Sequence, residues 1–209
     1  MRIESLKTTA DRAGRYWVSF EDGSRLGLYR QTVEDFGLYT GKELTEEELQ
    51  QLRTAAGKMS AKMRAVRIVS ASSVSGRDLE ERLVRKGEDP EQAREAVQWM
   101  EELHLVDDRN TAEALVHSCI AKGYGLSRAK QALFDKRIPK EYWEDALADY
   151  PDQTDRIESF LCSRLDADSD QKDIRRAVDA LLRRGHSYGT VRKVLNGLSF
   201  DTEEYFEDE

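Results

Sequence analysis

The sequence contains few of the residues that break or cross-link a chain. Its 209 residues include only three prolines and thirteen glycines, which excludes a collagen-like or low-complexity protein. Only two cysteines are present, Cys119 and Cys162, and they are far apart in the sequence. A disulfide framework is therefore not expected, and the cysteine content fits a reducing compartment.

Long apolar runs are also missing from the sequence. No stretch approaches the roughly 18 apolar residues that a membrane-spanning helix needs. The first thirty residues carry charges such as Arg2, Lys7 and Arg15, which the apolar segment of a signal peptide would not contain. We therefore expect a cytoplasmic protein.

The charge of the chain is high and unevenly distributed. Hydrophobic residues make up 39% and charged residues 35%, which favours an elongated shape over one large globule. The net charge of -8 argues against indiscriminate binding to DNA phosphates. Acidic residues concentrate in Glu43–Glu48 and Asp201–Glu209, whereas Arg and Lys recur in the middle. The acidic end has two readings, a solubilising terminus or a segment that repels or mimics DNA phosphates.

The first 58 residues differ in pattern from the rest. Two short runs rich in aromatic and aliphatic residues, Tyr16–Phe20 and Arg25–Tyr29, flank Asp22 and Gly23, and this pattern predicts a β-hairpin. Ile3–Leu6 can add a third strand. So small a sheet is marginal by itself, so we expect it to pack on a helix.

Two helices are predicted in the same region. They cover Thr32–Phe36 and Glu46–Lys58. Thr45 and Glu48 have the spacing of a capping box, in which each side chain satisfies a free amide at the start of the helix.

From about Met59 onward the sequence repeats itself. At an offset of 50 residues, Leu79, Leu83 and Lys86 fall opposite Ala129, Leu133 and Lys136. At an offset of 62, Gly123, Ala129 and Leu133 fall opposite Gly185, Val191 and Leu195. The unit reads as three helices joined by turns, and no unit has enough apolar surface to fold alone. We expect a mainly α protein: an N-terminal element with a small antiparallel sheet over 1–58, then three-helix repeats over 59–106, 107–152 and 153–209, the last with the acidic tail.

Helix boundaries are marked within the repeats. Ser75 can cap a helix that Gly87 ends, and Asp89 with Pro90 opens the next helix. Gly185 interrupts the third repeat in the way that Gly87 interrupts the first.

The sequence offers no convincing catalytic or metal site. Gly37 to Lys42 is one residue short of a phosphate-binding loop and continues with Glu43 in place of Ser or Thr, so it reads as a turn. Asp107 and Asp108 precede an apolar-periodic helix and read as helix caps before they read as a metal or acid/base pair.

The histidines do not form a recognisable site either. His104, His117 and Cys119 lack the paired short spacings of a zinc site, and His186 has no nominated catalytic partner. We therefore predict no catalytic residues, no metal and no cofactor, which leaves interaction as the function.

Basic residues are the sharpest signal in the repeats. Repetition of related units would set them at intervals along one surface, although each could also be a solvated residue paired with Glu80, Glu81 or Asp135. The candidate binding residues are Arg77, Arg82, Arg85, Lys86, Lys122, Arg128, Lys130, Lys136, Arg137, Arg183, Arg184, Arg192 and Lys193.

The motifs resemble those of the RecX regulatory proteins. Asp107 and Asp108, followed by Ala112–Ala114 and then Ile120–Gly125, are similar to the signature of that family. Ser75–Gly87 resembles its first repeat, and Leu181–Gly185 followed by Ser187 resembles its last. The chain departs from the family pattern at several places, among them Glu88 and His186, which stand where an aromatic residue usually follows the glycine.

The resemblance implies a curved array of three-helix repeats that lodges in the groove of a RecA filament on single-stranded DNA. It implies a regulator that inhibits the ATPase and strand-exchange activities of RecA in recombination, DNA repair and the SOS response, without a cofactor. The alternative is a helical module that binds DNA directly, since three-helix units resemble helix-turn-helix domains. A scaffold without any link to nucleic acid is a third reading. No heptad seam is present, so we expect a monomer.

Overall fold

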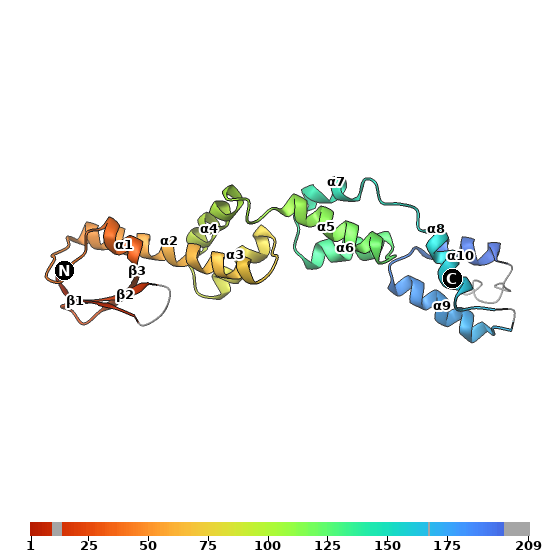
Figure 1. The fold of residues 1–209 in the computed structure, drawn as a ribbon, viewed down its shortest axis with the longest axis horizontal. Helices are drawn as coiled ribbons and strands as arrows, with labels where there is room; N and C mark the ends of the chain where they lie inside the picture. The colour runs from red at the N-terminus through yellow and green to blue at the C-terminus, as the bar shows by residue number, and fades with distance from the viewer. Residues whose placement is uncertain (10–13, 167, 199–209) are drawn as a thin grey trace. The chain divides into compact units, whose positions relative to one another are not determined.

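The computed structural model describes residues 1–9, 14–166 and 168–198. They form two compact units, Met1–Asp107 and Asp108–Glu209, which Figure 1 shows as a ribbon. The predicted acidic tail, Asp201–Glu209, lies outside the described residues. Each helix in the described part of the chain is too short or too polar to span a membrane.

The first unit begins with the predicted three-stranded antiparallel sheet. The strands β1 (Ile3–Thr8), β2 (Arg15–Phe20) and β3 (Arg25–Tyr29) lie in chain order. β2 and β3 form the predicted hairpin, and Gly23 adopts the positive φ of 80° that its turn requires.

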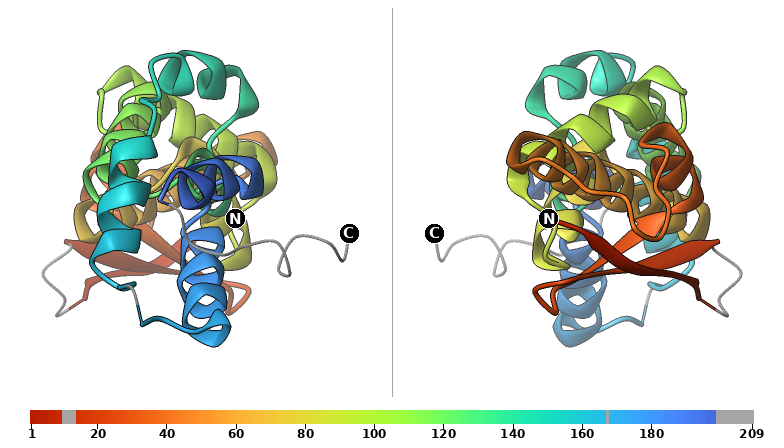
Figure 2. Two further views of the ribbon diagram at one scale, coloured as in Figure 1. Left: turned by 90° about the vertical axis from the view of Figure 1, so that its right-hand side faces the viewer. Right: turned by 90° about the vertical axis from the view of Figure 1, so that its left-hand side faces the viewer.

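Two helices cover one face of this sheet, as the right-hand view of Figure 2 shows. They are α1 (Arg30–Asp35) and α2 (Glu46–Ala71), and α2 begins with the predicted capping box of Thr45 and Glu48. Leu49 and Leu52 of α2 share a buried core with Val18 and Leu28 of the sheet. The sheet is therefore stabilised by a helix, as its size demanded.

The helix α2 is longer than predicted. It was expected over Glu46–Lys58 but continues to Ala71, because no proline interrupts it and its second half has its own packing partners. Ala61 and Ala65 are fully buried against α3 (Gly76–Arg85) and α4 (Pro90–Glu102). One helix thus serves both the N-terminal element and the first three-helix group.

The predicted helix starts of this group are confirmed. The Ser75 hydroxyl accepts a hydrogen bond from the Asp78 N–H at 3.1 Å. The Asp89 carboxylate accepts from the N–H of Glu91 at 2.9 Å, with Pro90 at the first helical position. Both side chains satisfy amides that would otherwise lack a partner in the first turn.

The second unit contains two further groups of helices. The first has α5 (Asp108–Ala121), α6 (Leu126–Asp135), a single 3-10 turn η1 (Lys140–Tyr142) and the short α7 (Trp143–Leu147). The second has α8 (Thr154–Cys162), α9 (Gln171–Arg183) and α10 (Tyr188–Gly197). Each group has its own buried core.

The repeat register is confirmed by burial. Leu83, Leu133 and Leu195, which fall opposite one another in the sequence, are each 0% exposed in α3, α6 and α10. The fold class is therefore as predicted: mainly α, with repeated three-helix groups and a small N-terminal antiparallel sheet.

The middle helices of the first two groups also end in the same way. After α3, Gly87 has a φ of 89°, and its N–H donates to the Val84 carbonyl at 2.9 Å. After α6 the equivalent residue is Arg137, which adopts a φ of 56° and donates to the Phe134 carbonyl at 2.8 Å. A left-handed residue at this position satisfies the last carbonyls of the helix even where glycine is absent.

Candidate functional site

The candidate basic residues of α3 divide into engaged and available groups. Arg82 is half-buried and forms an ion pair with Asp78, in which Nη2 and Oδ2 are 2.8 Å apart. Arg77 is exposed and pairs with Glu81 at 3.8 Å. Arg85 is exposed and forms no ion pair with any described residue. Of these three, Arg85 is therefore the most available to a partner. Arg77 comes next, because an exposed ion pair contributes little energy and exchanges readily.

The middle helix of the second repeat presents a similar division. Arg128, Lys130 and Arg137 are exposed, whereas Lys136 is half-buried. Asp135, which the sequence offered as a partner for these cations, accepts a hydrogen bond from Gln131 at 2.7 Å.

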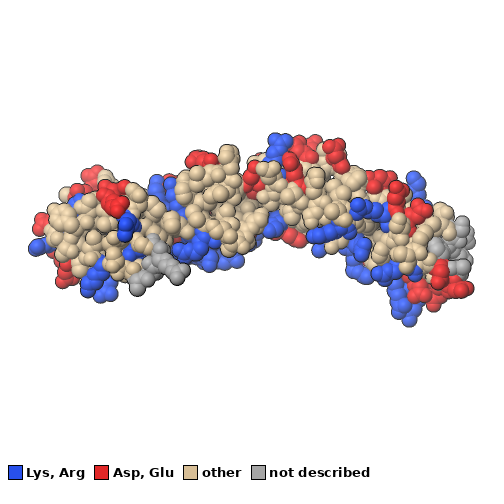
Figure 3. All heavy atoms as spheres, in the orientation of Figure 1, with Lys and Arg blue, Asp and Glu red and all other residues tan. Residues whose placement is uncertain are grey.

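The remaining candidates lie in the turn after α5 and in the third repeat, and all of them are exposed. They are Lys122 after α5, Arg183 and Arg184 at the end of α9, and Arg192 and Lys193 on α10. The Arg184 guanidinium lies over the Phe160 ring at 4.8 Å, which holds this side chain in place. Figure 3 shows Lys and Arg atoms along the α6 and α9 side of the second unit, and Asp and Glu atoms over α7.

Two turns of the second unit are joined through their backbones. The Gly125 N–H donates to the Arg184 carbonyl at 2.9 Å, and the Ser127 N–H donates to the Gly185 carbonyl at 3.2 Å. Gly125 is the N-cap of α6 and has no side chain to cap it, unlike Ser75 at α3. The turn between α9 and α10 therefore supplies the carbonyls that satisfy the start of α6.

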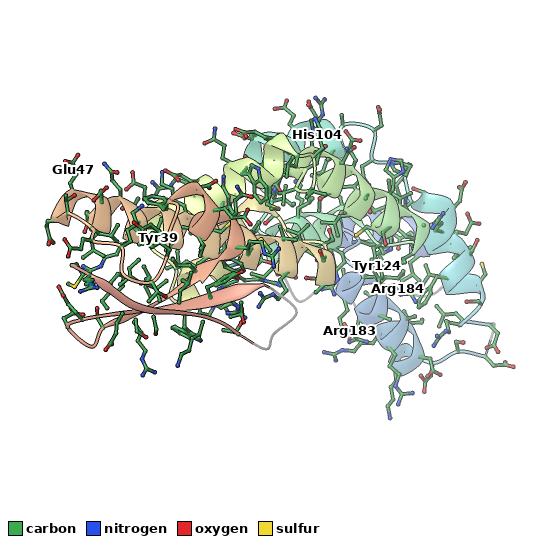
Figure 4. The ribbon with its side chains drawn as sticks, turned by 60° about the vertical axis from the view of Figure 1, so that its left-hand side comes forward. Tyr39, Glu47, His104, Tyr124, Arg183 and Arg184 are labelled. Carbon is green, nitrogen blue, oxygen red and sulfur yellow. The ribbon has the colours of Figure 1, made fainter. Side chains whose placement is uncertain are left out.

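Side chains reinforce this contact, which we call the turn junction and define by residues 120–128 and 184–186. Gly123 offers only a carbonyl oxygen, so Nε2 of His186 carries the proton in the 3.1 Å hydrogen bond between them. Arg156 Nη1 donates to the Ile120 carbonyl at 2.6 Å, and the Tyr150 hydroxyl donates to the Tyr124 carbonyl at 2.6 Å. Figure 4 shows Tyr124 and Arg184 at this contact.

The turn junction brings together cations that are distant in the sequence. Lys122 and Arg128 come from the second repeat, and Arg184 comes from the third. Arg156, which the sequence analysis did not select, joins them from α8. No local motif marks Arg156. It could have been identified only from its place on the helix, once the apolar stripe of that helix had been defined.

Cys119, beside the turn junction, and His186 within it do not have the pKa shifts of reactive groups. Burial raises the pKa of the Cys119 thiol, although Lys122 and Arg128 oppose this, so the thiol stays protonated at neutral pH. Burial lowers the pKa of His186. The hydrogen bond to Gly123 acts in the opposite direction and raises this pKa, whereas the positive charge of Arg184 lowers it further. A neutral, hydrogen-bonded imidazole here is a packing element.

Exposed apolar residues, which were not among the predicted binding residues, lie on the same helices. Val84 and Phe134 occupy equivalent positions of α3 and α6 and are 39% and 65% exposed. Leu126, Lys130 and Phe134 follow one another at intervals of four residues, so they share one face of α6. The 50-residue offset could have revealed that Val84 and Phe134 recur together.

Two departures from the family pattern fill buried positions. Glu88 is 9% exposed, and its carboxylate lies 2.7 Å from Arg64 Nε and 3.0 Å from the Ser60 hydroxyl, both on α2. His186 is 8% exposed and is held by Gly123. Specific polar contacts thus take the place of the apolar contact that usually follows such a helix end.

The segment that resembles a short phosphate-binding loop has a structural role. In the turn of residues 37–42, the Lys42 ammonium donates to the Phe36 carbonyl at 2.5 Å, so it closes the turn. Within residues 1–9, 14–166 and 168–198, no three His, Cys, Asp or Glu side chains lie close enough to hold a metal ion.

Known proteins share both the sequence pattern and this fold. Residues 107–147 match the family model for the second three-helix domain of RecX. The regulatory protein RecX of Clostridioides difficile (strain 630) is 25% identical over 207 residues, which cover 96% of each chain. The regulatory protein RecX of Oceanobacillus iheyensis is 26% identical and matches over 93% of this chain and 75% of that protein.

Two solved structures have a similar fold. A crystal structure of a regulatory protein RecX has a TM-score of 0.67 at 19% identity and covers 93% of this chain and 98% of that one. The structure of RecX from Lactobacillus salivarius has a TM-score of 0.59 at 23% identity and covers 69% of this chain and 97% of that one. In both sequence and fold, the chain is therefore similar to the RecX regulatory proteins.

Proposed function

We propose that this protein binds the RecA filament on single-stranded DNA and inhibits its ATPase and strand-exchange activities, in recombination, DNA repair and the SOS response. The observation that carries the proposal is that α3, α6 and α10, which hold equivalent positions in the sequence repeats, each bury apolar side chains and expose basic ones. Leu83, Leu133 and Leu195 are buried in the cores, while basic side chains such as Arg85 and Lys130 point to solvent. Binding can therefore use these charges without unfolding the repeats.

A RecA filament suits such a protein because the surface of the filament is periodic, as the repeats are. Related three-helix groups can make related contacts along it, and each contact raises the effective concentration of the next. The exposed cations would meet DNA phosphates or acidic side chains inside the filament, while the net charge of -8 disfavours bare DNA.

The relatives are named regulatory proteins, which supports a role without chemistry of its own. We accordingly propose a cytoplasmic monomer that is not an enzyme and needs no cofactor. We also propose that the repeats, over 59–106, 107–152 and 153–209, act together on one filament.

Direct DNA binding without RecA is the second candidate. The cluster of Lys122, Arg128, Arg156 and Arg184 at the turn junction favours it, because four cations there could neutralise neighbouring phosphates.

One experiment separates these functions. Fluorescence polarisation of the labelled protein is measured with bare single-stranded DNA and with RecA–DNA filaments, at several salt concentrations, alongside the RecA ATPase. The proposed function predicts tighter binding to filaments and a falling ATPase rate. The second candidate predicts equal binding to bare DNA with a steep salt dependence and no RecA effect beyond competition for DNA. A scaffold would bind neither.

A further inference from the structure

The outer face of the N-terminal sheet carries aromatic and basic residues. Side chains alternate along β2, so that Val18 faces the core while Trp17 faces outward and is 51% exposed. In the sheet register Trp17 pairs with Lys7 on one side and with Gly27 on the other. The first half of α2 packs against the opposite face of the sheet through Leu49 and Leu52, whereas Arg64 and Arg67 of its second half line one cavity with Trp17.

Trp17 is backed by the strand beside it. A Cβ atom built on Gly27 would lie 3.4 Å from the Trp17 ring, so the indole lies across the bare backbone of Gly27. The ring is thereby supported from one side, which makes it a flat apolar platform at the surface.

A cavity of about 210 Å³ adjoins this platform. Its sheet wall includes Arg15, Trp17 and Tyr29, and its helix wall includes Arg64 and Arg67 of α2. Arg64 and Arg67 are three residues apart, so they lie on one face of the helix.

Three arginines line the cavity. Arg64 is held by the Glu88 carboxylate at 2.7 Å and by the Lys86 carbonyl at 2.9 Å. Arg67 is exposed and forms no ion pair within the described residues, and Arg15 lies over the Tyr29 ring at 5.8 Å. The described residues that line the cavity include no Asp or Glu. An occupant would therefore be an anion with a flat ring system.

We propose that this cavity is a second, separate binding site, which takes one nucleotide of a single-stranded nucleic acid. A base stacks on Trp17, and the adjoining phosphate lies between Arg15 and Arg67. Aromatic platforms with neighbouring cations bind single strands without sequence preference, since every base has a flat face. This site needs no RecA, and its existence does not depend on the proposed function.

The test uses the 209-residue chain and fluorescein-labelled oligothymidylate without RecA. Binding is followed by fluorescence anisotropy, and stacking by quenching of tryptophan emission. Trp17→Ala is expected to weaken binding about tenfold, which corresponds to about 1.4 kcal/mol, and to remove the quenching. Trp17→Phe keeps a flat ring, so it should retain most of the binding while losing the quenching. Arg67→Ala should weaken binding and reduce its salt dependence.

Matched controls come from the same unit. Tyr39 is an exposed aromatic residue and Arg53 an exposed arginine, and neither lines the cavity. Tyr39→Ala and Arg53→Ala should bind like the parent. Reversing Lys130 and Arg183 on the helical repeats should leave the quenching intact, which separates this site from the proposed filament contact.

Three outcomes would overturn the proposal. The first is binding that is equal in the parent and in Trp17→Ala. The second is displacement of oligothymidylate by inorganic phosphate at similar concentration, which would indicate an anion site without stacking. The third is equal displacement by oligoglutamate, which would indicate a docking site for an acidic peptide.

Discussion

Gly125 and Gly185 lie in direct backbone contact although sixty residues separate them in the sequence. A Cβ atom on Gly125 would lie 2.1 Å from the Gly185 carbonyl oxygen, and a Cβ atom on Gly185 would lie 2.3 Å from the Arg128 nitrogen. No side chain can give way there, because the atoms in contact belong to the backbone. The two glycines allow the third repeat to cap α6.

Gly125→Ala should therefore destabilise the second unit by about 1–3 kcal/mol, the usual cost of forcing extra volume into a packed contact. Urea unfolding followed by circular dichroism measures this. Gly189→Ala is the matched control: its Cβ would meet nothing within 4 Å, and it lies in α10. Alanine there should be neutral or stabilise by up to about 1 kcal/mol. Equal stability of the two variants would show that the turn junction is not closed in solution.

The repeat register makes a second prediction. Leu83→Ala, Leu133→Ala and Leu195→Ala should each cost about 2–5 kcal/mol, because each leucine is 0% exposed at the same site of its group. Leu126→Ala, at a position 41% exposed, should cost much less. Thermal and urea unfolding provide the values. A harmless change at one of the three buried sites would refute its place in the core.

The third prediction concerns His186 and pH. Burial lowers the pKa of His186 in the folded chain below its unfolded value of about 6.5. When the pH falls below about 6.5, the unfolded chain therefore binds a proton at His186 more readily than the folded chain does. Folding stability should therefore fall as the pH drops from about 7.5 to about 5. His186→Gln should flatten this part of the stability curve, whereas His117→Gln, at an exposed position, should not. An unchanged slope in His186→Gln would contradict this assignment.

The sequence was informative wherever local pattern determines structure. Ser75 and Asp89 could be identified as caps, and Leu83 and Leu133 as core, because caps and helical periodicity depend on near neighbours. The family resemblance was likewise visible in motifs, since these recur at fixed spacing.

The tertiary features could not be predicted in the same way. The contact of Gly125 with Gly185 joins two turns that no local signal relates. Arg82 forms an ion pair with Asp78 and Arg85 does not, and only the three-dimensional geometry distinguishes the two arginines. The continuation of α2 beyond Lys58 depends on burial of Ala61 and Ala65 against later helices.

Filament binding through the basic residues of the repeats is tested by the binding of a charge-reversed triple variant to RecA–DNA filaments. Arg85→Glu, Lys130→Glu and Arg183→Glu change one exposed cation in each repeat, and none of the three forms an ion pair with a described residue. A control triple, Arg2→Glu, Arg30→Glu and Arg53→Glu, makes the same change in net charge on exposed residues of the N-terminal element. Surface substitutions of this kind usually alter stability by no more than about 0.5 kcal/mol each, so both variants should stay folded.

The measurement is filament affinity by polarisation, with the RecA ATPase rate read from the same samples. We predict that the repeat triple loses at least tenfold in affinity, about 1.4 kcal/mol, and no longer suppresses the ATPase, while the control triple behaves like the parent. Equal binding and equal suppression by the repeat triple would contradict the account and would show that the basic surface of the repeats is not the filament contact.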